Sequence, residues 1–250
     1  MSAITLIARK EAGELLSSAR GLAWLATLAA AMSAFGLLMV GNRQLSLLDN
    51  AQVVYDMSGI VIVLGALLAV VVGVDAVAGE RDRGSLIPLL ISPVPRTAIL
   101  FGKIGGQAIA WAVMLAVSIP YLWAVGSTNP NLGASILGVI VLGTPVVLGF
   151  GFLAMGLASR LTSSIGTLLT CLIVLTVSAS PLLLGPSLRQ SALGRMFDAV
   201  NPFSGAVNAL DATIIHNQSL LAQPAHLALV FGWLGLTLVF AIRGFRSITR

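Results

Sequence analysis

Charged residues are scarce in this sequence. Asp, Glu, Lys and Arg make up 9% of the 250 residues, whereas about one quarter of the residues of a soluble domain are charged. Hydrophobic residues make up 57% of the chain, and several apolar runs approach about 20 residues, the length that a membrane-spanning helix needs. The composition therefore excludes an ordinary soluble domain and predicts an all-α integral membrane protein.

Residues that commonly catalyse reactions or bind metals are also scarce. The one cysteine, Cys171, lies in an apolar segment, so no intrachain disulfide is possible and a small buried side chain is expected. The two histidines, His216 and His226, lie at or beyond the edge of the predicted spans, and no metalloprotease, serine-hydrolase or Cys/His motif is present. We therefore expect a protein that is not itself an enzyme and has no catalytic, metal or cofactor site. Asp75 alone among the carboxylates approaches a predicted span, which disfavours a proton-driven carrier.

A phosphate-binding loop is absent as well. Gly102-Lys103 resembles the end of such a loop, but Thr97 stands where a glycine is required and Ile104 where Ser or Thr is required. If ATP drives this protein, a separate subunit binds the ATP and its Mg²⁺.

Six membrane spans are predicted from the apolar runs. They lie near residues 22–40, 59–79, 100–125, 134–158, 164–184 and 226–243. Six spans place both termini on one side, and all basic residues except Arg43, Arg189 and Arg195 then lie on that side. Because basic residues mark the cytoplasmic side, we expect both termini in the cytoplasm. This orientation explains the net charge of +5 better than nucleic-acid binding does, since no basic cluster is present.

Residues 1–20 are predicted to form an amphipathic helix. Five apolar residues recur there at helical spacing, and the charged residues occupy other faces. The apolar set is Ile4, Ile7, Ala8, Ala12 and Leu15. Such a helix is expected to lie along the cytoplasmic membrane surface, or to be an ordinary helix that flanks the first span. That span should remain as an anchor, because Gly41-Asn42-Arg43 offers no signal cleavage site.

Small residues and prolines within the spans predict how the helices pack. Pro120 and Pro145 are expected to kink spans three and four, because proline removes a backbone hydrogen bond. Glycines at many positions would allow helices to approach closely in a membrane. These glycines are Gly65, Gly73, Gly105, Gly106, Gly149, Gly151, Gly156, Gly232 and Gly235.

The external segment 185–225 is too long for a simple connection. Its apolar pattern predicts two short amphipathic helices, separated by Asn201-Pro202, that lie at the outer membrane face or dip into it. This pair would either close an exit path or serve as a passive packing element.

A charged segment, residues 75–103, interrupts the apolar sequence between spans two and three. Gly79 and Gly84 should loosen the helix there, Ser85 can cap a short helix of about residues 85–92, and the Ser92–Pro95 stretch should end it. This helix has more apolar residues than a solvated loop keeps. It is therefore expected to meet the membrane on one side and a protein partner on another, or to be an ordinary interfacial helix.

The sequence from Asp75 to Arg96, with Gly102-Lys103, resembles the coupling segment of type-2 ATP-binding-cassette (ABC) exporter permeases. Six spans, cytoplasmic termini, the amphipathic start and the external helical pair match that family over nearly the whole chain. The resemblance implies a single permease domain, residues 1–250, in the bacterial cytoplasmic (inner) membrane. It also implies a homodimer, with spans one, two and five at the dimer interface, that sits on two copies of a separate ABC ATPase.

In that family the short cytoplasmic helix docks in a cleft of the ATPase. The resemblance therefore assigns the cytoplasmic segment 80–97 to the transmission of ATP-driven movement. The residues that it implies for this coupling are Glu80, Arg81, Asp82, Arg83, Leu86 and Leu89.

No strongly charged path is visible in the spans, which favours lipid-like, amphipathic or hydrophobic substrates over bare ions. Hydroxyls of span five, such as those of Thr167 and Thr170, would face a pathway or bond to carbonyls of their own helix. The chain is also similar to a subgroup that serves maturation of periplasmic copper enzymes such as nitrous oxide reductase, although Arg81 and Arg83 depart from its pattern. Two alternatives to an exporter thus stay open: a subunit that transmits mechanical work to, or supplies, a periplasmic partner, and a scaffold without energy coupling.

Overall fold

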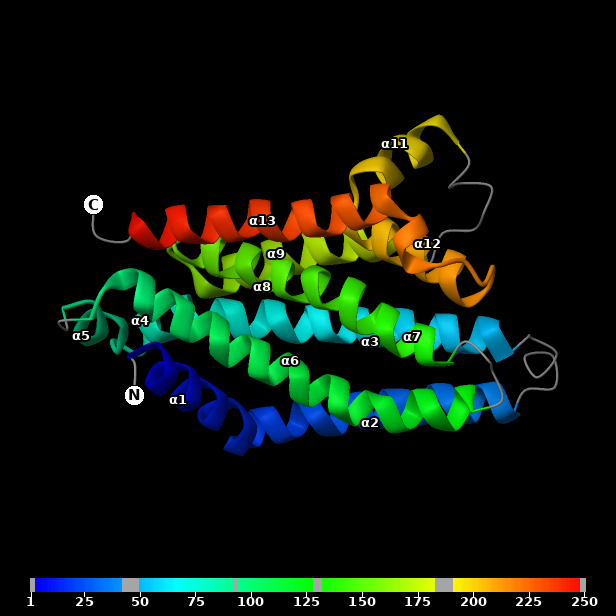
Figure 1. Cartoon of the computed structure of the whole chain (residues 1–250). Coiled ribbons are helices and arrows are strands. Elements are labelled where there is room, and N and C mark those ends of the chain that lie inside the picture. The colour runs from blue at the N-terminus through cyan, green and yellow to red at the C-terminus, as the bar shows by residue number, and fades with distance from the viewer. Residues whose placement is uncertain (1–2, 42–49, 92–93, 128–131, 183–190, 248–250) are drawn as a thin grey trace.

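The computed structural model describes residues 3–41, 50–91, 94–127, 132–182 and 191–247. Every regular element within these ranges is helical, which confirms the predicted all-α fold. Long helices run side by side along one axis (Figure 1). They are α2 (Ala19–Gly41), α3 (Asn50–Val74), α6 (Arg96–Gly126), α8 (Thr144–Ala158), α9 (Ser164–Ala179) and α13 (Pro224–Arg246).

Helix α3 lies at the centre of this bundle and packs against α6, α8 and α9. Val54, Met57 and Val61 on α3 are completely buried. Because lipid and side chains are equally apolar, close packing has to hold membrane helices together. A Cβ atom at Gly73 of α3 would lie only 2.6 Å from the carbonyl oxygen of Gly151 on α8, so these two glycines bring the helices into backbone contact.

Most of the predicted packing glycines do lie at helix contacts, but two do not. Cβ atoms built at Gly65, Gly149 and Gly156 would collide with aromatic side chains of neighbouring helices. By contrast, Gly232 and Gly235 on α13 have no atom within 4 Å of such a Cβ. For those two positions the packing prediction is wrong within this chain, because this face of α13 carries no neighbouring helix.

Five helical stretches in the described part of the chain are long and apolar enough to cross a membrane. They are Gly21–Leu38, Ala51–Asp82, Arg96–Gly126, Leu132–Ala158 and Pro224–Arg246. The remaining predicted span, 164–184, corresponds to the 16-residue apolar helix α9, which continues as a 3₁₀ turn, η4 (Ser180–Leu182). Since α9 is shorter than the roughly 20 residues that a span needs, the count of six stays a prediction.

Two of these stretches contain a π-helical turn. The turn η3 (Val139–Gly143) joins α7 (Leu132–Gly138) to α8 directly before Pro145, where the missing N–H interrupts regular α-helical bonding. The turn η2 (Asp75–Gly79) joins α3 to the short helix α4 (Glu80–Asp82). Pro120, the other predicted kink position, lies inside α6.

The predicted N-terminal helix is α1 (Ala3–Ser17), and it packs on α6 as well as facing outward. Figure 1 shows α1 beside the first part of α6. A Cβ atom at Gly102 would lie 2.6 Å from the Cβ atom of Ile7. A Cβ atom at Gly105 would lie 3.0 Å from the Cβ atom of Ala8. Ile4 and Leu6 remain exposed. The inner face of α1 is therefore held by the bundle rather than by a membrane surface.

The predicted external pair is present as α11 (Ala192–Val200) and α12 (Pro202–Ile214). The Asn201 side chain accepts a hydrogen bond from the Phe203 N–H and donates to the Ser178 carbonyl oxygen at 2.8 Å, which caps α12 and ties it to α9. Helix α12 dips into the bundle, with Phe203 and Leu210 fully buried. Helix α11 instead projects from the bundle (Figure 1) and carries an exposed apolar face of Leu193, Met196 and Val200. The residues 183–190 that precede this pair lie outside the described ranges.

Replacing Gly102 with Ala should loosen α1 from α6 and destabilise the protein. The new Cβ overlaps with Ile7, whose branched side chain cannot move aside freely, and such overpacking costs about 1–3 kcal/mol. The matched control is Gly13→Ala on α1, where nothing lies within 4 Å and alanine favours the helix by about 1 kcal/mol. The thermal unfolding midpoint in detergent and the rate of tryptic cleavage after Arg9 and Lys10 measure both effects. Equal midpoints for the two variants would contradict the packing described here.

Candidate functional site

A fully buried lysine, Lys103, joins three elements at the cytoplasmic end predicted for the bundle. Its Nζ atom lies 2.9 Å from Glu11 Oε1 of α1 and 2.8 Å from Glu80 Oε1 of α4. The exposed side-chain fractions are 0% for Lys103, 18% for Glu11 and 9% for Glu80. One ammonium group therefore holds the N-terminal helix and the start of the charged segment against α6.

The local sequence explains why these charges meet. Gly102 and Gly106 let α1 approach α6 closely on both sides of Lys103, and a Cβ at Gly106 would lie 2.5 Å from that of Glu11. Glu80 directly follows the η2 turn at the end of α3, so it sits where that helix leaves the core. Removing one partner of a buried ion pair typically costs about 3–5 kcal/mol, because a buried charge is left uncompensated. The three-residue cluster should therefore be sensitive to change at any member.

A second ion pair lies next to this cluster. The Arg83 Nη1 and Nη2 atoms donate to the two Asp75 carboxylate oxygens at 3.0 and 3.3 Å. The hydrogen bond to Asp75 raises the pKa of the Arg83 guanidinium above its usual range. Both side chains are about half exposed, so the pair orients the segment more than it stabilises it.

Arg81 connects the charged segment to the end of α8 and the turn that follows it. Its guanidinium donates to the Ala158 carbonyl oxygen at 3.2 Å and to the Thr162 carbonyl oxygen at 2.8 Å. These carbonyls lie at the end of α8 and in the turn before α9, where helical partners are lacking. Arg81 thus caps α8 from another element and couples α4 to α8.

The turn after α4 is a Schellman motif. Gly84 adopts a left-handed conformation with φ +71°, its N–H donates to the Arg81 carbonyl, and the Ser85 N–H donates to the Glu80 carbonyl. The chain then enters α5 (Leu86–Ile91), the short helix predicted at 85–92. Gly84 therefore sets the direction in which α5 leaves the bundle.

The six residues proposed for coupling occupy different environments. Glu80 and Leu86 are buried and Arg81 is half-buried with bonds to α8, whereas Asp82 and Arg83 are exposed. The side chain of Leu89 lies outside the described part of the structure. Lys103 and Glu11 were missed as site residues. The available signal was a lysine within the predicted third span, 100–125, where a charge is costly and usually functional.

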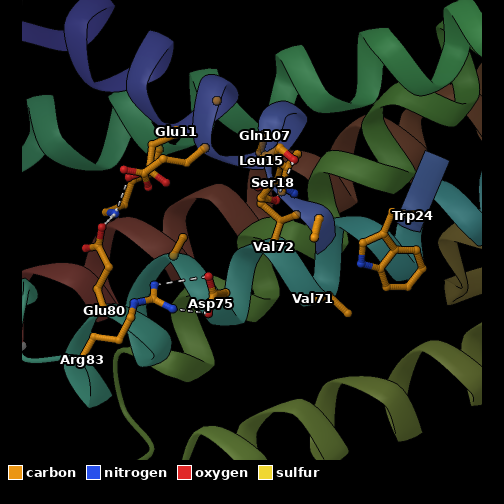
Figure 2. Close-up of a pocket in the computed structure, with 15 residues that line it drawn as sticks. Glu11, Leu15, Ser18, Trp24, Val71, Val72, Asp75, Glu80, Arg83 and Gln107 are labelled. Carbon is orange, nitrogen blue, oxygen red and sulfur yellow. Dashed lines mark hydrogen bonds and ion pairs between the residues drawn. The ribbon is translucent and has the colours of Figure 1, made fainter. Parts of the chain in front are cut away.

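A cavity of about 480 Å³ opens beside the cluster, between α1, α2, α3, η2, α4 and α6. Figure 2 shows Glu11, Glu80, Arg83 and Asp75 on one side of it and Trp24 and Val71 on the other. Leu15, Ser18, Val72 and Gln107 also line the cavity, as Figure 2 shows. It therefore has a charged end and an apolar end.

Two hydroxyls of α9, those of Thr167 and Thr170, form hydrogen bonds within their own helix. Thr167 donates to the Ser163 carbonyl and Thr170 to the Gly166 carbonyl, each at 2.8 Å. Of the two alternatives for these threonines, bonding to their own helix is the one observed. The cluster around Lys103, with its adjoining cavity, is therefore taken as the candidate site.

Replacing Lys103 with Met should destabilise the protein by about 3–5 kcal/mol, because Glu11 and Glu80 lose their common partner. The control is Lys10→Met, which removes an exposed pair with Glu14 and should cost less than about 1 kcal/mol. Denaturant unfolding in detergent micelles measures both. Adding Glu11→Gln and Glu80→Gln to the Lys103→Met variant should recover part of the loss. No recovery would show that packing, not charge, causes the effect.

Nearly the whole chain matches a known protein family. Residues 5–247 match a family model described as ABC-2 family transporter protein. No curated protein matches the chain. The match includes α1, the charged segment, the cavity and the external helices.

Proposed function

Since the chain belongs to the ABC-2 family of transporter proteins, we propose that this multi-pass membrane protein is the permease subunit of an ATP-driven exporter. Its partner is a separate ABC ATPase, which binds ATP and Mg²⁺. The proposed assembly contains two copies of the ATPase and two copies of this chain. It lies in the bacterial cytoplasmic membrane with both termini in the cytoplasm, as the distribution of basic residues indicates.

The observation that carries this proposal is the connection of α4 to three other parts of the bundle. Glu80 binds Lys103 on α6, which also binds Glu11 on α1, and Arg81 binds carbonyls at the end of α8. Energy coupling requires an element whose contacts differ between two states of its partner. A displacement of α5 by the ATPase would therefore pass through α4 to α1, α6 and α8 together.

The environments of the six coupling residues support two roles. Asp82 and Arg83 are exposed and are proposed to contact the ATPase, together with Leu89 on the basis of the family resemblance. Glu80, Arg81 and Leu86 point into the protein and are proposed to transmit the movement.

The proposed substrates are lipid-like, amphipathic or hydrophobic compounds. The described spans carry few charges along their length, and the cavity beside Lys103 combines a charged end with an apolar end. Bare ions would find no continuous charged path there.

One observation favours a second function, transmission of work to a periplasmic partner such as a copper-enzyme maturation protein. The exposed Leu193, Met196 and Val200 of α11 form an apolar face that projects from the bundle on the proposed external side. A partner protein would cover such a face. ATP hydrolysis that depends on an added periplasmic protein, without transport into vesicles, would favour this function over export.

Co-purification of the tagged chain with an ABC ATPase from its native host tests the proposal. The reconstituted complex should hydrolyse ATP, and Arg81→Ala should lower the permease-dependent rate by about tenfold, because a hydrogen bond to a charged group contributes about 1.5–3 kcal/mol. Assembly should be unchanged, since Arg81 bonds within the chain. Lys10→Ala, which removes an exposed cation on α1, is the control. Isolation of the chain without an ATPase would contradict the proposed function, and unchanged hydrolysis in Arg81→Ala would contradict the proposed role of Arg81.

Substitutions of Gly84 test whether the direction of α5 matters. Gly84→Val should weaken binding of the ATPase, since a branched side chain in the left-handed region costs about 1–2 kcal/mol and the turn would change. Gly84→Asn should bind normally, because asparagine visits this region readily. Nothing lies within 4 Å of a Cβ at this position, so a steric clash does not contribute to the difference between the two variants. Quantitative pull-down measures both variants, and equal binding would argue against a fixed α5.

A further inference from the structure

Three exposed arginines, Arg160, Arg243 and Arg246, lie where α8 and α13 end side by side. A Cβ atom at Gly244 would lie 2.9 Å from the carbonyl oxygen of Gly156, so the two helices touch there. Figure 1 shows that α13 ends at the same end of the bundle as α4 and α5. Neither α8 nor α13 contains Asp or Glu, and within the described ranges no carboxylate pairs with any of the three arginines. Their positive charge therefore stays available for an anion.

Arg160 is held in place although it is exposed. Its Cζ atom lies 4.5 Å from the centre of the Phe240 ring, which is a cation–π contact between the end of α8 and α13. The ring is itself fixed against α8, since a Cβ atom at Gly156 would lie 2.3 Å from the Phe240 Cδ1 atom. A stacked guanidinium keeps the N–H groups at its edge free to donate. Arg160 is thus oriented as a donor before any ligand binds.

The exposed apolar face of α13 leads directly to the other two arginines. Leu236 and Val239 are 66% and 47% exposed, and Arg243 and Arg246 follow at helical spacing on the same face. Position 243 lies 19 residues after Pro224, the start of α13, which corresponds to roughly 29 Å of helix. This length is close to the hydrocarbon thickness of a bilayer, about 30 Å. The arginines therefore lie where the apolar layer ends and the lipid headgroups begin.

We propose that Arg160, Arg243 and Arg246 bind the phosphate of an anionic phospholipid, whose acyl chain lies along the exposed face of α13. Guanidinium groups bind phosphate oxygens strongly and in bidentate geometry. Basic clusters between membrane helices on the cytoplasmic side are suited to anionic headgroups. An acidic protein surface would also match the charge, but the adjoining apolar face favours one molecule that carries both a phosphate and an acyl chain. The inference requires only a chain embedded in a membrane, so it does not depend on coupling to an ATPase.

Native mass spectrometry of the full, delipidated chain in detergent tests this site by measuring the dissociation constant of the first bound lipid. The wild type should bind dioleoylphosphatidylglycerol at least about tenfold more tightly than dioleoylphosphatidylcholine, because only the former has a net negative charge at the arginines. Arg160→Gln should weaken the binding of phosphatidylglycerol about fivefold, and replacing all three arginines with Gln should remove most of the preference. The matched control is Arg9→Gln, which removes an exposed cation of α1 and should bind like the wild type.

Equal affinities of the wild type for the two lipids would overturn the proposal, even if a variant fails to fold. Equal losses in Arg160→Gln and Arg9→Gln would also overturn it, because they would show a diffuse attraction to basic residues. Soluble glycerol 3-phosphate should not displace the lipid, since it lacks acyl chains, and displacement would identify a free phosphate as the ligand instead. Arginine variants that keep the lipid preference but lose a protein in pull-down would assign the surface to that protein and overturn the lipid site.

Discussion

The arrangement of the helices at the proposed cytoplasmic end depends on a single buried ammonium group, that of Lys103. Lys103 lies within an apolar helix, and the two carboxylates that compensate its charge come from α1 and α4. Without them, the bundle would contain an unpaired buried charge, which is costly in an apolar environment. The positions of α1, the charged segment and the adjoining cavity therefore follow from one electrostatic requirement.

Hydropathy and turn residues predicted much of this fold. Apolar runs predicted the long helices. Gly84 predicted the break before α5, and Asn201-Pro202 predicted the break before α12, because these signals are local in the sequence. The partners of Lys103 were not predictable, since Glu11 lies 92 residues away and helical periodicity does not say which neighbour a face meets. Burial of α12 was likewise only partly foreseen, because a short amphipathic helix suits a membrane surface as well as a bundle.

Two kinds of contact hold the helices together, and they occur in different places. Within the bundle, glycines bring backbones into contact, as at Gly73 and Gly151, and such contacts leave little room for sliding. Around α4 the contacts are ion pairs and hydrogen bonds of long side chains, which tolerate small shifts without losing their partners. The polar end is thus better suited than the bundle to change its arrangement, as a coupling element must.

Arg81 illustrates how such a contact constrains a sequence through evolution. Its guanidinium binds main-chain oxygens at positions 158 and 162, and every amino acid supplies a carbonyl there. Selection for this interaction therefore acts only on the side chain at position 81. The residues at positions 158 and 162 can be substituted without removing the acceptor oxygens. The pair of positions 80 and 103 is different, because both side chains carry the interaction. Among related chains, covariation between positions 80 and 103 would therefore reveal the lysine cluster. The interaction of Arg81 with α8 would produce no such covariation, although Arg81 lies on the same short helix as Glu80.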